Sequence, residues 1–165
     1  PLVADKVLHL PPSHLGFYMG SITGAFLVGS FISNRLAKHT ASTKLVLAGR
    51  MISVFGLSLG LIIVMFGNVS SLSIFGSTLF IGLGNGMSLP SCYVGVMNVR
   101  SDLAGSAAGL SGAMGVAAGA ILATMMGAIL TENNAAFGFL SFLLVAKIIS
   151  LAGAILAHNL ERKIN

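Results

Sequence analysis

Charged side chains are scarce in this sequence. They make up 8% of its 165 residues, whereas soluble domains average about 25%. By contrast, 55% of the residues are hydrophobic and the mean hydropathy is +0.95. Because a protein surface that faces water needs more charged residues than this, we expect an integral membrane protein. The formal charge of +5 does not indicate a nucleic-acid partner, because the basic residues lie in short connections between apolar runs.

Cysteine and catalytic motifs are almost absent as well. The single cysteine, Cys92, excludes an internal disulfide, and it has no Cys or His at metal-ligand spacing. The sequence contains no HExxH, no GxSxG, no phosphate-binding loop and no pair of acidic residues inside an apolar run. We therefore expect no enzyme, no metal site and no cofactor.

Long apolar runs are what the sequence has instead. A membrane-spanning helix needs about 20 mostly apolar residues, and five stretches qualify, at 15–36, 45–66, 72–99, 103–130 and 135–158. Residues 1–12 are interpreted as the end of a preceding helix and an outer loop, because Pro11 and Pro12 interrupt a helix. Ser13 is the expected N-cap of the first span. The predicted architecture is an all-α, five-helix transmembrane domain over residues 13–165.

The distribution of lysine and arginine predicts how the spans are oriented. Seven of the nine basic residues fall at the connections after the first, third and fifth spans: Arg35, Lys38, Lys44, Arg50, Arg100, Arg162 and Lys163. By the positive-inside rule these face the cytoplasm, which places the start of the chain outside and its end inside. The chain starts at Pro1 and shows no signal peptide. We expect it to be a piece of a larger protein whose N-terminal part is absent.

Glycine recurs at helical spacing on several spans. The spaced glycines are Gly16, Gly20 and Gly24 on the first span, Gly56 and Gly60 on the second, and Gly105, Gly109, Gly115 and Gly119 on the fourth. Such stripes allow helix backbones to approach closely, although a chain with 21 glycines also produces some pairs by chance. We expect the stripes on the first and fourth spans to pack against a missing part of the protein. Both should then be exposed in this chain.

The third span holds the candidate substrate site. Asn85 lies near the middle of the span, and Ser88 and Cys92 follow at i+3 and i+7 on the same helical face. Pro90 removes one backbone N–H and frees a carbonyl group nearby. One interpretation is a cavity wall in which these residues and Tyr93 contact a substrate. The alternative is a kinked helix whose Asn85 bonds the backbone of a neighbouring helix.

Two basic residues lie inside apolar spans. Lys147 is about 12 residues into the fifth span, close to the membrane centre, and no acidic partner is visible for it. A buried ammonium group is usually functional, but we favour a neutral or snorkelling lysine on a peripheral helix. Arg50 lies nearer the end of its span and is expected to extend toward the cytoplasm.

Two stretches resemble transporters of the major facilitator superfamily. GSFISNRLAKHTASTKLVLAGR resembles the second copy of the cytoplasmic loop motif of that superfamily, with Ser30, Asn34, Arg35 and Lys38 at the motif positions. FIGLGNGMSLPSCYVGVMNVRSDLAGSAAGLSGAMG resembles the hairpin between the tenth and eleventh helices of its drug–proton antiporter branch, the bicyclomycin/chloramphenicol-resistance type. The resemblance implies that the five spans correspond to helices eight to twelve, which form the C-terminal half of such a transporter.

The resemblance also implies a function. It implies efflux of small drug-like molecules by proton antiport with alternating access, in a bacterial inner membrane. The third span would line the cavity, the first and fourth would pack on the missing N-terminal half, and Asn34, Arg35 and Lys38 would stabilise one gate state. The implied partners are drugs, protons, the lipid bilayer and that missing half. The alternatives are a non-transporting membrane scaffold or assembly subunit, an inactive gene fragment and, less favoured, a membrane enzyme.

Overall fold

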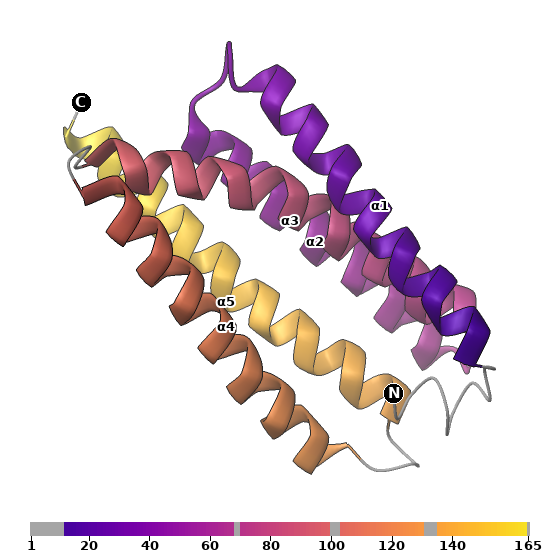
Figure 1. Ribbon diagram of the computed structural model, residues 1–165. Helices are drawn as coiled ribbons and strands as arrows, with labels where there is room; N and C mark the ends of the chain where they lie inside the picture. Colours follow the sequence, from indigo (N-terminus) through magenta and orange to yellow (C-terminus); the bar gives the residue numbers. More distant parts are fainter. Residues whose placement is uncertain (1–11, 68–69, 100–102, 131–134, 165) are drawn as a thin grey trace.

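The computed structural model describes residues 12–67, 70–99, 103–130 and 135–164, and all regular secondary structure within these ranges is helical. Successive helices run in opposite directions (Figure 1). They are α1 (Pro12–Leu36), α2 (Ser42–Met65), α3 (Ser71–Val99), α4 (Ala104–Ile129) and α5 (Ala135–Ile164). Each of the five is long and apolar enough to cross a membrane. The expectation of an all-α chain with five candidate membrane spans is therefore confirmed.

The helix boundaries lie close to the apolar runs. α3, for example, was expected over 72–99 and occupies Ser71–Val99. α1 begins at Pro12, so the expectation that residue 12 belongs to a loop and that Ser13 caps the helix is wrong. Proline is accepted at the first helical position, because the N–H that it lacks would have no partner within the helix.

α3 is the central helix of the bundle. α1 and α2 pack along it, and α5 packs mainly against α2 (Figure 1). α4 lies at the edge and makes only slight contact with α3 and α5. Half of the most apolar window of α3 is buried, whereas none of the corresponding window of α4 is buried. The chain therefore consists of a close-packed group, α1, α2, α3 and α5, and one nearly uncovered helix.

Glycines on α3 allow its two neighbours to approach closely. Gly82 and Gly86, one turn apart, face α1, and a Cβ added at either would collide with a backbone carbonyl oxygen of that helix. Gly84 faces α2, where an added Cβ would collide with the carbonyl oxygen of Gly49. Backbone-to-backbone packing of this kind is typical of helices in membranes. It places α1 and α2 on two faces of α3 and leaves a third face for other contacts.

Serine hydroxyls bond across the same two contacts. Ser33 on α1 donates to the Met87 carbonyl oxygen at 3.0 Å, and its hydroxyl lies 3.2 Å from that of Ser91. Ser53 on α2 donates to the Phe80 carbonyl oxygen at 3.3 Å. Each interhelical bond of this kind contributes about 0.6 kcal/mol on average in a membrane protein. Steric fit at the glycines therefore matters more to this packing than any one bond.

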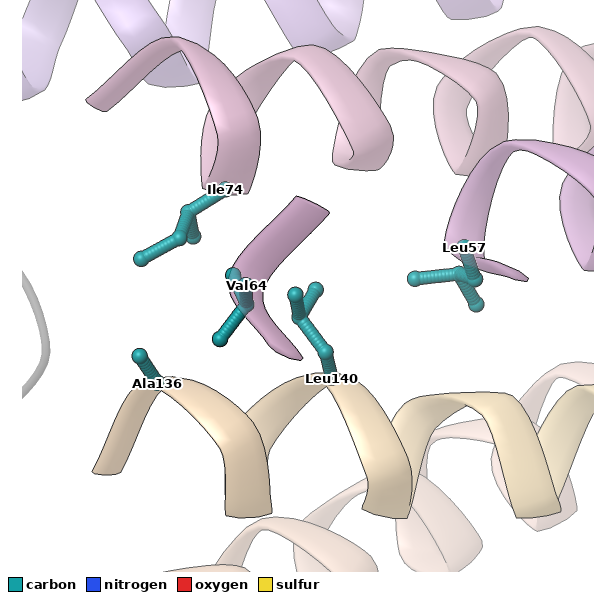
Figure 2. Close-up of a cluster of buried hydrophobic side chains, with 5 residues drawn as sticks. All are labelled: Leu57, Val64, Ile74, Ala136 and Leu140. Atoms are coloured by element: carbon teal, nitrogen blue, oxygen red, sulfur yellow. The ribbon is translucent and has the colours of Figure 1, made fainter. Parts of the chain in front are cut away.

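An apolar cluster joins α5 to α2 and α3. Its buried members are Leu57, Val64, Ile74, Ala136 and Leu140. Their side chains point toward one another from the three helices (Figure 2). Leu57 and Leu140 are completely buried. The cluster fixes which face of α5 is turned toward the bundle.

Exposed basic side chains gather at one end of the bundle. The ends of α1, α3 and α5 and the beginnings of α2 and α4 lie at this end (Figure 1). Arg35, Lys38 and Lys44 are exposed there. Within the described ranges, the opposite end carries no lysine or arginine. This asymmetry is the one on which the expected orientation rests.

Candidate functional site

Asn85 lies at the middle of α3 and is half-buried. α3 remains helical on both sides of it, through the glycines at 84 and 86 and through Pro90. Gly84 lies against the backbone of α2, and Gly86 lies against the backbone of α1 on another face of the helix. The Asn85 side chain occupies the remaining face, where α5 approaches.

Two cationic side chains from different helices bond to Asn85. Lys147 on α5 donates from Nζ to Asn85 Oδ1 at 2.7 Å. Arg50 on α2 donates a guanidinium N–H to the same oxygen at 3.4 Å. An amide oxygen has two lone pairs and can accept both bonds. We refer to these residues as the Arg50–Asn85–Lys147 cluster.

The contacts correct the expectations for the two basic residues. Lys147 has a partner, the side-chain amide of Asn85, and the helix that carries it packs against α2. It follows the fully buried Leu140 by seven residues and therefore shares the inward face of α5. Arg50 turns toward α3 instead of reaching only for the basic end of the bundle. The alternative interpretation had expected Asn85 to bond the backbone of a neighbouring helix, but its partners are the side chains of Arg50 and Lys147.

One sequence signal could have indicated this cluster. Arg50, Asn85 and Lys147 are each a strongly polar residue in an apolar stretch of a different helix. Polar residues inside membrane spans usually face the bundle interior and pair with one another. The contacts join positions 35 and 62 residues apart, so no local pattern links them.

The cluster combines two positive charges with a neutral amide. Both donors bond one oxygen, so their nitrogens lie no more than about 6 Å apart. At an effective dielectric constant of about 20, two like charges at that distance repel each other by about 3 kcal/mol. The amide supplies only a dipole. An anionic group placed between the two cations would remove this repulsion and gain attraction from both.

The acidic residues of the chain are placed elsewhere. There are four: Asp5, Asp102, Glu132 and Glu161. The first three fall outside the described residues, before α1 or in the connections on either side of α4. Glu161 belongs to the last turn of α5, about 21 Å along the helix axis from Lys147. The described side chains include no carboxylate, and among the described residues no three potential metal ligands lie together.

Of the three other expected substrate residues, only Cys92 shares the face of Asn85. Ser88 is completely buried and donates to the carbonyl oxygens of Gly84, at 2.7 Å, and Val46, at 3.3 Å. It therefore belongs to the contact between α2 and α3 and not to the face of Asn85. Cys92 is a free, half-buried thiol two turns further along the Asn85 face. Tyr93 is directed toward α4, where its hydroxyl oxygen lies 3.8 Å from a Cβ added at position 112.

The residues of the loop motif lie at the basic end of α1. Ser30 and Asn34 line a groove of about 290 Å³ between α1 and α3, with Pro90 and Ser91 on its other wall. The kink-prone proline thus faces the groove and not Asn85. The groove is separate from the Arg50–Asn85–Lys147 cluster.

The two basic residues of the motif lie outside the groove lining. Arg35 is exposed, with its guanidinium carbon 5.3 Å from the centre of the Phe31 ring. Lys38 is exposed in the turn after α1. Both are free to meet a partner at the cytoplasmic side in the expected orientation.

The glycine stripes divide into two kinds. Gly56 and Gly60 on α2 are buried against Phe80 and Ser77 of α3. At seven other positions an added Cβ would have no described atom within 4 Å to meet: Gly16, Gly20, Gly24, Gly105, Gly109, Gly115 and Gly119. We refer to the surfaces that these seven form as the open glycine faces of α1 and α4. Their exposure agrees with the expectation for faces whose packing partner lies outside this chain.

Comparison with known proteins identifies no relative. No protein-family model, no curated protein and no solved structure matches this chain. The resemblance to drug–proton antiporters thus remains a prediction from the quoted motifs.

Proposed function

We propose that this chain is the C-terminal half of a transporter that exports small drug-like molecules in exchange for protons. In this proposal it belongs to the drug–proton antiporter branch of the major facilitator superfamily. α1 to α5 are helices eight to twelve, and α3 is the helix that lines the substrate cavity. The protein lies in a bacterial inner membrane, with its basic end in the cytoplasm.

The observation that carries the proposal is the Arg50–Asn85–Lys147 cluster. The cluster places polar groups from three helices around the middle of α3, in a chain whose helices are long and apolar enough to cross a membrane. Polar and ionisable groups at this depth are costly, and in membrane proteins they usually mark a path for a substrate or an ion. A lipid-embedded support can hold its helices together with uncharged polar groups and small residues, so the two cations favour the transporter.

The open glycine faces supply the second requirement of the proposal. Alternating access depends on two halves that rock against each other around a central site. The faces of α1 and α4 are apolar, rich in glycine and uncovered, so they are suited to contact a second half. The exposed Arg35 and Lys38 lie where such a half would close on the cytoplasmic side.

Replacing Asn85 tests the proposal. In the complete natural protein, we expect Asn85→Leu to lower drug efflux from cells by about tenfold or more, because a leucine removes the acceptor shared by the two cations. Asn159→Leu is the matched control, since Asn159 is an exposed asparagine near the end of α5. Efflux is measured for several drugs at equal protein levels. Unchanged efflux of every drug by the Asn85 variant would remove this residue from the transport site.

A membrane scaffold or assembly subunit is the second candidate, and the open glycine faces favour it equally. A scaffold would use the same faces to bind a partner protein. The reading frame upstream of Pro1 separates the two. Six or seven further apolar spans in frame support the transporter, whereas a stop codon there supports the scaffold or an inactive gene fragment.

A further inference from the structure

We propose that the Arg50–Asn85–Lys147 cluster binds an anionic group, a carboxylate or a sulfonate, carried by a mostly apolar molecule or side chain. This inference rests on the proposed transport function insofar as it names a substrate class. The anionic group could also be a carboxylate side chain of the protein itself, which would then neutralise one of the two positive charges of the cluster. The experiments below separate these two sources.

The hydrogen-bonding groups of the cluster point to this chemistry. Lys147 has three N–H groups and Arg50 has five, and each directs one of them to Asn85 Oδ1. Neither side chain bonds another acceptor among the described residues, so their other donors remain for a further acceptor. A guanidinium group matches the two oxygens of a carboxylate in geometry, and an ammonium group binds either oxygen as a point charge. A single oxyanion beside Asn85 is therefore within reach of both cations.

The charge balance selects an anion over a neutral acceptor. A carbonyl or hydroxyl group could accept the same hydrogen bonds, but it would leave two positive charges close together in apolar surroundings. None of the four acidic side chains is among the described ones, and no acidic residue lies in the middle of any of the five helices, so the described part of the cluster carries positive charge only. An anion neutralises one charge and is attracted by both. We therefore expect the cluster to distinguish anionic from neutral ligands more strongly than it distinguishes ligands of different shape.

The surroundings of the cluster define the rest of the ligand. On the face of α3 that carries Asn85, Ile81 lies one turn before it and Leu89 one turn after. Ile81 packs on the apolar cluster shared with α5, and Leu89 is exposed. A strongly hydrated inorganic ion would gain little from such neighbours. An organic anion with an aromatic or aliphatic body fits them.

Two fluorescent probes with one ring system test the substrate source. 8-Anilinonaphthalene-1-sulfonate is an anion, and N-phenyl-1-naphthylamine is its neutral analogue without the sulfonate. Inside-out membrane vesicles containing the complete natural protein are energised, and the uptake of each probe is measured. In Lys147→Gln we expect the ratio of sulfonate to neutral uptake to fall about tenfold, because one of the two cations is lost. Lys147→Arg should keep the ratio, and Lys44→Gln, at an exposed lysine, is the matched control.

Carbodiimide crosslinking tests the side-chain source. Dicyclohexylcarbodiimide enters bilayers and activates carboxyl groups. A carboxyl group that contacts Lys147 then forms an amide with Nζ, and mass spectrometry of the digested protein identifies the joined peptide. A crosslink that requires Lys147 and is absent from Lys147→Arg and Lys147→Gln establishes a side-chain carboxylate as the anion. Without a crosslink, a selective loss of sulfonate uptake establishes a small-molecule anion.

The results separate the inference from the proposed function. If the unmodified protein transports neither probe and no other drug, the transport function is wrong, and the crosslink alone decides whether an anion meets the cluster. If the neutral probe is transported, the uptake ratio is the same in the unmodified protein and Lys147→Gln, and no crosslink forms, the anion site is overturned while transport stands. If Lys147→Gln fails to accumulate, the comparison is made with Arg50→Gln, for which the same fall in the ratio is expected.

Discussion

α3 and α4 are both rich in small residues, yet their glycines have opposite surroundings. On α3, Gly82, Gly84 and Gly86 are pressed against the backbones of α1 and α2, and a single added carbon atom would collide there. On α4, Gly105 and Gly109 face no described atom within 4 Å of an added Cβ. The same residue type thus forms close backbone contacts in one helix and an uncovered surface in the other.

The difference shows what a glycine stripe means in a membrane helix. Spacing identifies a face that permits close approach, but a neighbour must be present for that face to be used. α3 has two neighbours within this chain, whereas α4 has almost none. If the open faces pack only against another part of the complete protein, substitutions in the two helices should differ sharply in their effects. Three experiments test this comparison.

The largest effect is expected at position 86. A leucine there would collide with the α1 backbone at Phe26 and Ser30, and backbone cannot yield as a flexible side chain does. Overpacking typically costs about 1–3 kcal/mol, and we expect Gly86→Leu to reach or exceed the upper limit. The free energy of unfolding is measured by circular dichroism in dodecyl maltoside titrated with sodium dodecyl sulfate. A loss below about 0.5 kcal/mol would contradict the close approach of α1 and α3.

A smaller effect is expected at Ser88. Its hydroxyl bonds the Gly84 and Val46 carbonyl oxygens inside the contact of α2 with α3. Ser88→Ala should lower the free energy of unfolding by about 1 kcal/mol, since the methyl group fits but the bonds are lost. Ser106→Ala on the exposed surface of α4 is the matched control and should change it by less than about 0.5 kcal/mol. Equal losses in the two variants would mean that the hydroxyl of Ser88 adds nothing to this contact.

The smallest effect on stability is expected at Gly109. Gly109→Leu should change the unfolding free energy of this chain by less than about 0.5 kcal/mol, because nothing described occupies the space. If the proposed transport function holds, the same leucine in the complete protein should abolish transport, whereas Gly109→Ala, with a single added methyl group, should retain most of it. Transport is measured as drug efflux from cells at matched protein levels. Normal efflux with leucine at this position would show that the open face of α4 meets lipid and not protein.

The sequence predicted the helices well and their contacts less well. Apolar length alone placed all five helices, because in lipid the backbone must bond within itself and a crossing needs a fixed number of residues. It also located Asn85 at the middle of its helix. Periodicity indicates which residues share a face, but not which helix lies opposite. For this reason Ser88 was placed with Asn85, although Ser88 and Gly84, one turn earlier, both face α2.

The contact between Lys147 and Asn85 was beyond prediction for a different reason. Depth along each helix was visible from the sequence, and it suggested that both residues lie near the middle of the bundle. The rotation of α5 about its axis decides whether Lys147 points inward, and that rotation depends on the packing of Leu140 and Ala136 against α2 and α3. Such packing depends on three helices together, so the sequence of any one helix does not reveal it.

The bare surface of α4 also bears on movement. Side chains on a helix form ridges, and two helices lock in register when tall ridges enter each other's grooves. Glycine and alanine leave only shallow ridges, so a helix that packed on the open glycine face of α4 would interlock with it less than with a face of large side chains. A leucine-rich contact between two helices fixes one relative position of the helices, whereas a contact made of small residues permits several. The helix with the fewest contacts to the rest of this chain, α4, is therefore also the one whose glycine face would hold a neighbouring helix least firmly.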